Sequence, residues 1–193
     1  PGEASLFKES EFWDGPLHES VQVYGSVRKL STIGSWAYAK QHNLDVINLI
    51  LSNMYGPGDH FEEKRSHALG ALIMKMVKAK LEENEEVIVW GTGSPVREWM
   101  FVDDGAESLV RAMDIPKSID LINIGVGKGI SIIDLANLIK LETRYEGKLV
   151  FDKTKPDGAP FKTVDGSNGK RIFIWSPEKD FKVGIKETVK WYE

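Results

Sequence analysis

The feature that most constrains the fold is a helix pattern that leads directly into a short, mostly apolar strand pattern. Residues 24–42 contain no proline, and apolar side chains recur there at helical spacing: Val27, Leu30, Ile33 and Ala37. The run Val46–Leu51 follows and is bounded by a Gly-Pro-Gly turn at 56–58. A largely apolar strand after a helix is typical of a buried parallel strand and forms half of a β-α-β unit. The sequence therefore predicts an α/β fold.

Helix and strand patterns continue to alternate downstream. One face of a helix is marked by Leu69, Leu72, Ile73, Met76 and Val77. Strands are predicted within 87–91, 98–102, 122–124 and 148–152. Two capping patterns, Asp104 with Glu107 and Ser131 with Asp134, predict helix starts. A last helix is predicted over 183–192, with Ile185, Val189 and Tyr192 on one side.

Composition excludes several classes of protein. The 193 residues are enough for one domain or for two small ones that share a core. There is no cysteine, which excludes disulfides and thiolate sites, and the four histidines show no metal-ligand spacing. The net charge of −4 gives no general reason to expect a surface for polyanions, although a local basic pocket is compatible with it. No apolar run approaches the roughly 20 residues that span a bilayer.

The first twenty residues are polar and irregular in pattern. They have neither the basic start nor the apolar stretch of a signal peptide, and the chain does not begin with methionine. The segment reads like the middle of a longer chain, and a cytoplasmic setting is the expectation. A glycine-rich dinucleotide-binding motif is absent from the sequence, and its nearest counterpart, Gly125–Gly129, is interpreted as a turn.

Six short motifs occur in one order along the chain: "YGSVRK", "SNMYGPGD", "SHALGALIMK", "VWGTGSPVREWMFVDD", "INIGVGKGISIIDLA" and "FDKTKPDGAPFK". Together they resemble the C-terminal part of the nucleotide-sugar epimerase/reductases in the extended short-chain dehydrogenase/reductase family. Within that family the resemblance is greatest to the enzymes that epimerise and reduce GDP-4-keto-6-deoxymannose with NADPH. The runs "GTGSPVRE", "VDD" and "KPDG" carry most of the specificity.

The resemblance implies a fold and a domain division. It implies the C-terminal part of a Rossmann-type parallel sheet plus a smaller α/β substrate-binding domain. Residues 1–60 would be the last part of the dinucleotide-binding domain, and 61–193 the substrate-binding domain. It also implies NADP as cofactor, a nucleotide sugar (favouring a GDP-sugar) as substrate, and a homodimer to which Trp36 and Tyr38 contribute. A core role for these two aromatic residues stays open.

The resemblance places Tyr24 at the family's catalytic tyrosine and Arg28 at the position of its lysine. Residues four apart face the same side of a helix, and a cation there favours the tyrosinate, which otherwise forms near pH 10. Arginine supplies charge and hydrogen bonds to the nicotinamide ribose but does not lose a proton as lysine can. Lys29 is rotated by about 100° from that side. The alternative is a tyrosine packed on a helix beside an exposed basic pair.

His67 matches the family's general acid for epimerisation, a role that suits an imidazole with a pKa near 6.5. An exposed histidine at a helix start is the alternative. Four residues match substrate contacts: Lys75, Trp90, Arg97 and Asp157. Their alternatives are a solvated helix lysine, a core tryptophan, an ion pair of Arg97 with Glu98 or Asp103, and a turn aspartate before glycine.

Three residues near the end of the first predicted strand match positions that border the nicotinamide and substrate: Leu51, Asn53 and Met54. In open α/β sheets the ligand crevice lies at the carboxyl ends of the strands. Asn53 could instead simply hold its loop. A departure from the family pattern occurs at Phe161, where the family has arginine, and this leaves the identity of the nucleotide base open.

Two alternative functions remain compatible with these residues. One is another nucleotide-sugar enzyme, such as a GDP-mannose 4,6-dehydratase or a UDP-glucose 4-epimerase. The other is a nucleotide-sugar-binding relative with impaired catalysis, which Arg28 and Phe161 favour. In either case the isolated chain is expected to have negligible turnover, because the backbone donors of a glycine-rich turn are not among its residues.

Overall fold

The computed structural model describes residues 6–193 except 18, 63–65 and 116. One sheet consists of β1 (Ile47–Leu51) and β5 (Ile119–Ile124), which run parallel. Three helices are associated with this part of the fold: α1 (Gln22–His42), α3 (Val102–Met113) and α5 (Ser167–Phe173). A small core of Met100, Ile122, Ile124 and Phe173 lies here. The mostly apolar run at 46–51 thus forms the parallel strand that its composition predicts.

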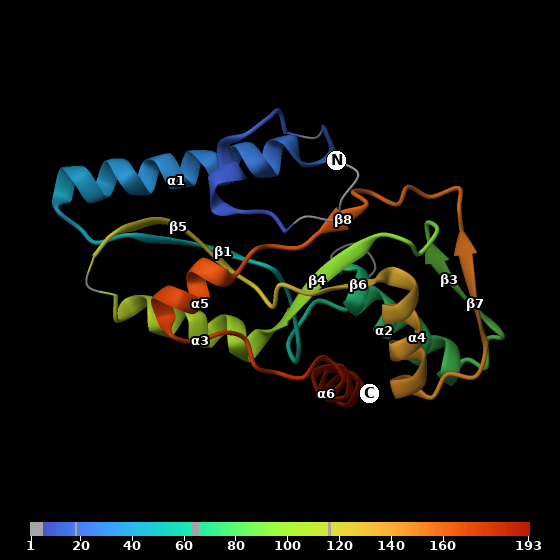
Figure 1. The fold of residues 1–193 in the computed structure, drawn as a ribbon. Helices are drawn as coiled ribbons and strands as arrows, with labels where there is room; N and C mark the ends of the chain where they lie inside the picture. Colours follow the sequence, from blue (N-terminus) through green and yellow to red (C-terminus); the bar gives the residue numbers. More distant parts are fainter. Residues whose placement is uncertain (1–5, 18, 63–65, 116) are drawn as a thin grey trace.

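A second sheet is built around β4 (Val96–Phe101). Its neighbours are β2 (Asn53–Tyr55), parallel to it, β6 (Gly129–Ser131), antiparallel, and β8 (Phe161–Lys162), parallel. Beside it lies a parallel pair, β3 (Glu86–Trp90) with β7 (Lys148–Asp152), at the far end of the molecule from α1 (Figure 1).

Three helices cover this second part and supply most of the larger core. They are α2 (Ala68–Leu81), α4 (Ile132–Thr143) and α6 (Phe181–Tyr192). Their buried side chains include Leu69, Ile73, Met76, Leu135, Ile139, Ile185 and Val189. The predicted apolar faces of α2 and α6 are therefore the faces that pack, and Tyr192 lies against the same core.

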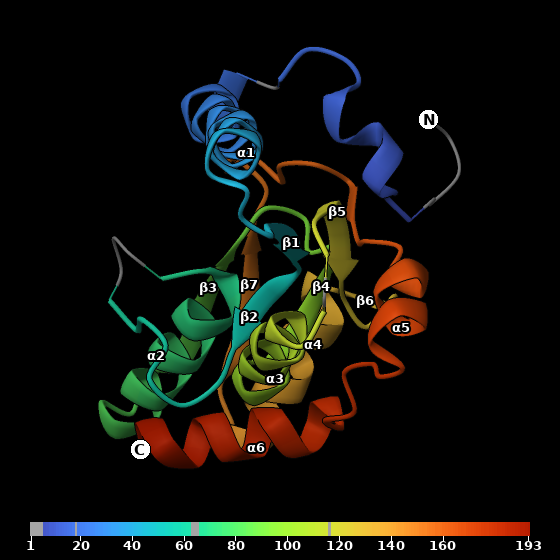
Figure 2. The ribbon, with the colours of Figure 1, turned by 90° about the vertical axis from the view of Figure 1, so that its left-hand side faces the viewer.

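Helix α1 stands apart from both cores, as Figures 1 and 2 show. Thr32 is its single buried side chain. On the side of α1 that faces the rest of the protein, Ser35 exchanges hydrogen bonds with the Asn48 side chain on β1. On the same helix, Trp36 packs on Trp13, with ring centroids 5.4 Å apart. Trp13 belongs to η1 (Glu9–Trp13), one of two short 3₁₀ helices with η2 (Glu19–Val21). The rest of α1 exposes apolar residues to solvent.

The two predicted capping patterns have different outcomes. Ser131 is confirmed as the N-cap of α4, because its Oγ accepts the Asp134 N–H at 3.1 Å. The prediction at Asp104 is wrong: α3 begins at Val102, so Phe101 rather than Asp104 is the N-cap residue, and no side chain caps the helix. Asp104 instead accepts the N–H of Lys179 at 3.1 Å. The Asp104 carboxylate, which the local pattern predicted to cap the helix, therefore binds the backbone of a distant segment instead.

The β1–β5 sheet takes strands from both sides of the predicted division at residue 60. β5 lies in the second predicted segment, yet it pairs with β1 in the first. The chain passes from the β1–β5 sheet to the β4 sheet at Ser52 and, after returning through α3 and β5, passes to it again at 125–128. The boundary itself stays a prediction. Within the described ranges, no helix has both the length and the apolar character needed to cross a membrane.

Candidate functional site

Trp90 forms the centre of a basic and aromatic group at the end of β3. Its side chain is 60% exposed, and the ammonium groups of Lys75 and Lys155 lie 5.4 and 5.6 Å from its ring centroid. Lys75 also donates to the carbonyl of Ile88 at 3.0 Å, which fixes it between α2 and β3. An exposed indole with two nearby ammonium groups can stack on a flat ring and attract an anion.

Asp157 organises the turn that follows Trp90. Its carboxylate accepts the backbone N–H of Thr92 at 2.7 Å and the Thr92 hydroxyl at 2.8 Å. Gly91 has φ of +82°, and a Cβ at this position would collide with Asp157 Oδ1. The turn therefore requires glycine at 91 and an acceptor at 157. Asp157 thus acts on a turn 65 residues away rather than on its own turn before Gly158, and its role toward a ligand stays a prediction.

Arg97 joins this group from β4. Its Nη2 donates to the backbone carbonyl of Asp157 at 3.3 Å, and its Nη1 donates to the Val96 carbonyl at 2.8 Å. Burial lowers the pKa of Arg97, and the charge of Asp157 opposes that shift. In the described part of the chain neither Glu98 nor Asp103 forms an ion pair with it. Lys75 and Trp90 thus form one contacting pair and Arg97 and Asp157 another. The Asp157–Thr92 bonds join the two pairs through the backbone at 90–92, and the four residues are called the connected set.

Tyr24 and Arg28 lie on the same side of α1. Tyr24 is 64% exposed, and the Arg28 guanidinium carbon lies 4.9 Å from its ring centroid. Lys29 instead points to Trp13, with its ammonium 5.7 Å from that ring. The guanidinium therefore occupies the position one turn from the tyrosine, stacked on the ring, while the lysine faces elsewhere, as the helical rotation requires.

The remaining predicted site residues lie at strand and helix ends. His67 is the exposed N-cap residue of α2, and its side chain makes no capping bond. Leu51 ends β1 and packs on the smaller core. Asn53 donates from Nδ2 to the Glu98 carbonyl at 3.1 Å, and Met54 packs against Gly105. The holding role of Asn53 is thus real, whether or not it also borders a ligand.

These groups do not form one connected site through direct contacts. Within the ranges that the structure describes, no hydrogen bond, ion pair or aromatic contact joins Tyr24, Arg28 or His67 to Trp90 or Arg97. The four residues predicted to bind substrate are linked to one another by the Lys75–Trp90 and Arg97–Asp157 contacts and by the backbone at 90–92. A single cleft that also contains the tyrosine and the histidine stays a prediction.

One buried group near this set was not predicted to matter. Glu98 is 1% exposed, and its carboxylate accepts backbone N–H groups from Val126, Gly127 and Val164. The segment Gly125–Gly129 is therefore a turn, and two of the N–H groups that a phosphate would use there are bound by Glu98. A single glutamate in a strand carries no spacing signal, so the sequence offers no means of finding this arrangement.

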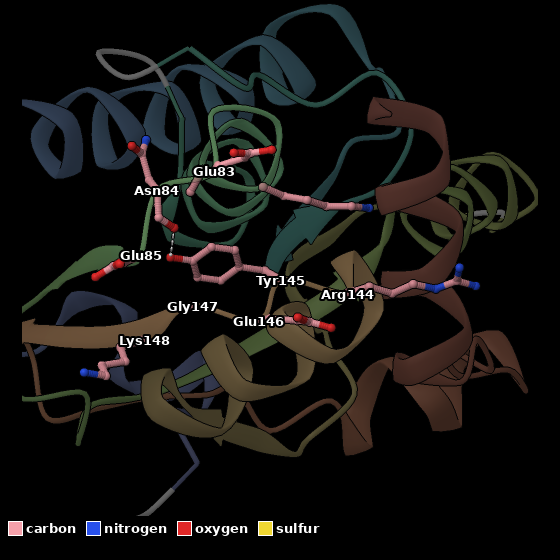
Figure 3. A pocket seen from close by; sticks show the side chains of 10 residues that line it. Glu83, Asn84, Glu85, Arg144, Tyr145, Glu146, Gly147 and Lys148 are labelled. Atoms are coloured by element: carbon pink, nitrogen blue, oxygen red, sulfur yellow. Dashed lines mark hydrogen bonds between the residues drawn. The ribbon is translucent and has the colours of Figure 1, made fainter.

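A hollow on the opposite end of the larger core contains none of the predicted site residues. It is lined by the ends of α2 and α4, including Glu83–Glu85 and Arg144–Lys148 (Figure 3). The Tyr145 hydroxyl donates to the Asn84 carbonyl at 2.9 Å, and burial, with a smaller contribution from Glu86, raises the pKa of Tyr145. This hydrogen bond joins the segment after α4 to the segment after α2, which gives Tyr145 a structural role in the hollow.

Comparison with known proteins agrees with the motifs. Residues 2–125 match the family described as "NAD dependent epimerase/dehydratase family". The chain is 42% identical over 175 residues to GDP-L-fucose synthase 1 of Arabidopsis thaliana, covering 90% of this chain and 54% of that protein. It is 39% identical over 184 residues to a probable GDP-L-fucose synthase 1 of Oryza sativa subsp. japonica, covering 95% of this chain and 56% of the relative.

A solved structure shares the fold. It is a GDP-L-fucose synthetase from Naegleria fowleri bound to NADP, 31% identical, with a TM-score of 0.84 over 92% of this chain and 57% of that one. The chain thus spans little more than half the length of these relatives. The predicted α/β class and the resemblance to nucleotide-sugar epimerase/reductases are confirmed. The chain belongs to the NAD dependent epimerase/dehydratase family.

Proposed function

We propose that this chain provides the substrate-binding part of an NADP-dependent epimerase/reductase that acts on a GDP-4-keto sugar. The observation that carries the proposal is the connected set of Lys75, Trp90, Arg97 and Asp157. It combines an exposed indole with fixed cations, which suits a nucleotide with a diphosphate. The similarity to GDP-L-fucose synthases, measured over nearly the whole chain, supports the choice of GDP-sugar.

Each residue of the set has a role in this proposal. The Trp90 ring would stack on the base or the sugar, because its face is open to solvent. Arg97 would bind a phosphate through its planar fork, which suits two phosphate oxygens. Lys75 would add charge from α2. Asp157 would keep the turn at 91–94 in place and accept from a base or sugar donor.

The predicted site residues outside the connected set would contact the cofactor or transfer protons. NADPH would supply the hydride. The Arg28 guanidinium is exposed and donates no hydrogen bond to any described residue, so it fits a ribose contact. Leu51, Asn53 and Met54 fit a cofactor border less directly, since their side chains already contact the protein. Tyr24 would exchange a proton at the sugar oxygen, and His67 at a ring carbon.

Calorimetric titration of the chain with GDP tests the proposal. We expect binding, and we expect Arg97→Ala to weaken it by roughly tenfold to a hundredfold, the cost of a charged hydrogen bond. Arg171→Ala is the control, because Arg171 is exposed and contacts Asn168 at a different place. Equal affinity of Arg97→Ala and wild type, or no binding of GDP, would refute the proposal. UDP in the same experiment tests the base.

A second candidate is a nucleotide-sugar-binding relative with impaired catalysis, and the position of Arg28 favours it. The Arg28 guanidinium lies over the Tyr24 ring, with its carbon 4.9 Å from the ring centroid, and no hydrogen bond joins it to the Tyr24 hydroxyl among the described residues. In a chain that also carries the dinucleotide-binding part of its relatives, Arg28→Lys should raise turnover if this candidate is correct. An unchanged rate would show that arginine suffices. A cytoplasmic homodimer is part of the proposal and stays a prediction.

A further inference from the structure

Glu98 is a buried acid without a neighbouring cation. Its side chain is 1% exposed, and none of the ion pairs found in the described ranges includes it. A buried carboxylate is costly unless hydrogen bonds satisfy its oxygens. Burial raises the pKa of Glu98, and the N–H groups of Val164, Gly127 and Val126 oppose that rise. Such an acid is retained in a core only where it holds something.

The groups that it holds come from two distant segments. Oε1 accepts from Val126 and from Gly127, the latter at 3.0 Å, in the turn between β5 and β6. Oε2 accepts from Val164 at 2.8 Å, two residues after β8. A Cβ on Gly125 would collide with Oε1 and with the Val164 side chain, so the turn approaches the carboxylate as closely as glycine allows.

Two connections that lead from the β1–β5 sheet to the β4 sheet meet at this point. The first passes from β1 to β2 through Ser52, whose N–H donates to the Ile124 carbonyl at 3.0 Å. The second passes from β5 to β6 through the turn that Glu98 holds. Asn53 adds a bond to the Glu98 carbonyl at 3.1 Å. Glu98 therefore stands where the β1–β5 sheet joins the β4 sheet.

Its neighbour Arg97 lies on the opposite side of the same strand, since successive strand residues point to opposite faces. Arg97 pairs with Lys162 of β8, and the segment just before β8 carries Asp157. The segment just after β8 carries Val164, which Glu98 holds. A shift of Val164 relative to β4 would thus be transmitted along β8 toward the Arg97–Asp157 contact.

We propose that the Glu98 carboxylate is a positioning group that fixes the β5–β6 turn and the segment after β8 against β4, and so sets the placement of Arg97 and Asp157. The expected effect on ligand binding rests on the proposed function. The expected effect on the β5–β6 turn and on the segment after β8 is independent of that function. Glu98 itself touches no ligand in this proposal.

Amide hydrogen exchange, followed by NMR on the whole chain, tests the positioning with Glu98→Gln. The carboxamide keeps one acceptor oxygen and turns the other into a donor. The oxygen should stay with Val126 and Gly127, which share one acceptor, and the NH₂ should face the Val164 N–H. We expect the exchange of Val164 to rise about tenfold or more, and that of the other two to change little.

Two further variants keep the result decisive. Glu107→Gln, in an exposed ion pair with Arg111, is the control and should leave all three amides protected. Gly125→Ala should push the carboxylate aside without altering its charge and should expose the same amides, which serves if Glu98→Gln does not fold. Unchanged protection of Val164 in folded Glu98→Gln would overturn the proposal.

Titration with GDP then separates this proposal from the proposed function. We expect Glu98→Gln to bind GDP about tenfold more weakly than wild type, and Glu107→Gln to bind equally. If Val164 is released and GDP affinity stays that of wild type, the placement of Arg97 does not depend on Glu98, and that part of the proposal is overturned. If wild type binds no GDP, the proposed function fails, and the amide pattern still decides the positioning role.

Discussion

At position 28 the family has lysine and this chain has arginine, and the type of side chain changes how the cation contacts Tyr24. The spacing of four from Tyr24 puts both side chains on one side of α1, and the structure has them in contact. The contact is a planar cation stacked on the ring. A lysine ammonium is a compact point charge and would approach the hydroxyl instead. The sequence therefore predicted the neighbours, and the structure supplied the mode of contact.

Gly91 offers a test of the turn at 91–94 that Asp157 holds. Gly91 and Gly58 have φ of +82° and +84°, but a Cβ collides with Asp157 Oδ1 only at Gly91; at Gly58 it meets none of the described atoms. Gly58→Ala should cost about 1–2 kcal/mol, the strain of positive φ. Gly91→Ala should cost more, because the Asp157–Thr92 bonds are also lost. Urea unfolding measures both. Equal costs would contradict the role of Asp157.

Asp165 gives a prediction for pH. Hydrogen bonds from the Ser167 side chain and then from its N–H lower the pKa of Asp165 below its ordinary 3.8. A carboxylate with a lowered folded pKa stabilises the fold above its unfolded pKa, and that contribution disappears as pH falls through the folded value. Wild type should therefore be more stable than Asp165→Asn at pH 6, and the difference should shrink as pH falls below 3.8, as denaturant unfolding at several pH values will measure.

Ser167→Ala is the matching variant for this prediction. It removes the largest cause of the lowered pKa and keeps the backbone donor. The pH dependence that Asp165 contributes should shrink in it. A difference between wild type and Asp165→Asn that does not change with pH would contradict the assignment.

At the scale of helices and strands, local signals succeeded where local bonds decide the outcome. The Ser131 cap of α4 and the buried faces of α2 and α6 follow from spacing alone. Three short strands, β2, β6 and β8, and the helix α5 were not predicted, since two or three paired residues carry no periodicity. The three strands form because each pairs with β4, which lies in a distant part of the chain.

The two capping patterns can be separated by substitution. Ser131→Ala should destabilise the protein by about 1 kcal/mol and increase exchange in the first turn of α4. Asp104→Ala should leave the start of α3 unchanged and increase exchange at Lys179, whose N–H it accepts. Hydrogen exchange measures both. Fraying of the first turn of α3 in Asp104→Ala would restore the capping interpretation.

At the scale of the whole molecule, the fold has two parts, one around the β1–β5 sheet and one around the β4 sheet. Figure 2 shows α1 on one side of β1 and β5, with α2, α3 and α6 on the other side. The connected set of Lys75, Trp90, Arg97 and Asp157 lies on the second part, and Tyr24 lies on α1. A reaction that uses both would require a ligand long enough to reach from one part to the other, as a nucleotide sugar with its cofactor is.

The isolated chain should therefore bind GDP but show no measurable turnover. We expect no NADPH oxidation above background when the chain is supplied with GDP-4-keto-6-deoxymannose, because its residues include no glycine-rich turn to hold the pyrophosphate. Absorbance of NADPH at high protein concentration measures this, with boiled protein as control. Turnover that is abolished by Tyr24→Phe would contradict the expectation and would show that this chain alone completes a site.

The sequence by itself determined the α/β class, the main helices and strands and the family, since these depend on local periodicity and on short motifs in order. Only the tertiary structure decided that Asp157 shapes the turn at 91–94, that Asp104 holds a distant loop, and that Glu98 sits at the junction of the two sheets. The physical reason is that a polar side chain binds whichever donor the fold brings to it. Partners that are 28 to 75 residues away leave no trace in local spacing.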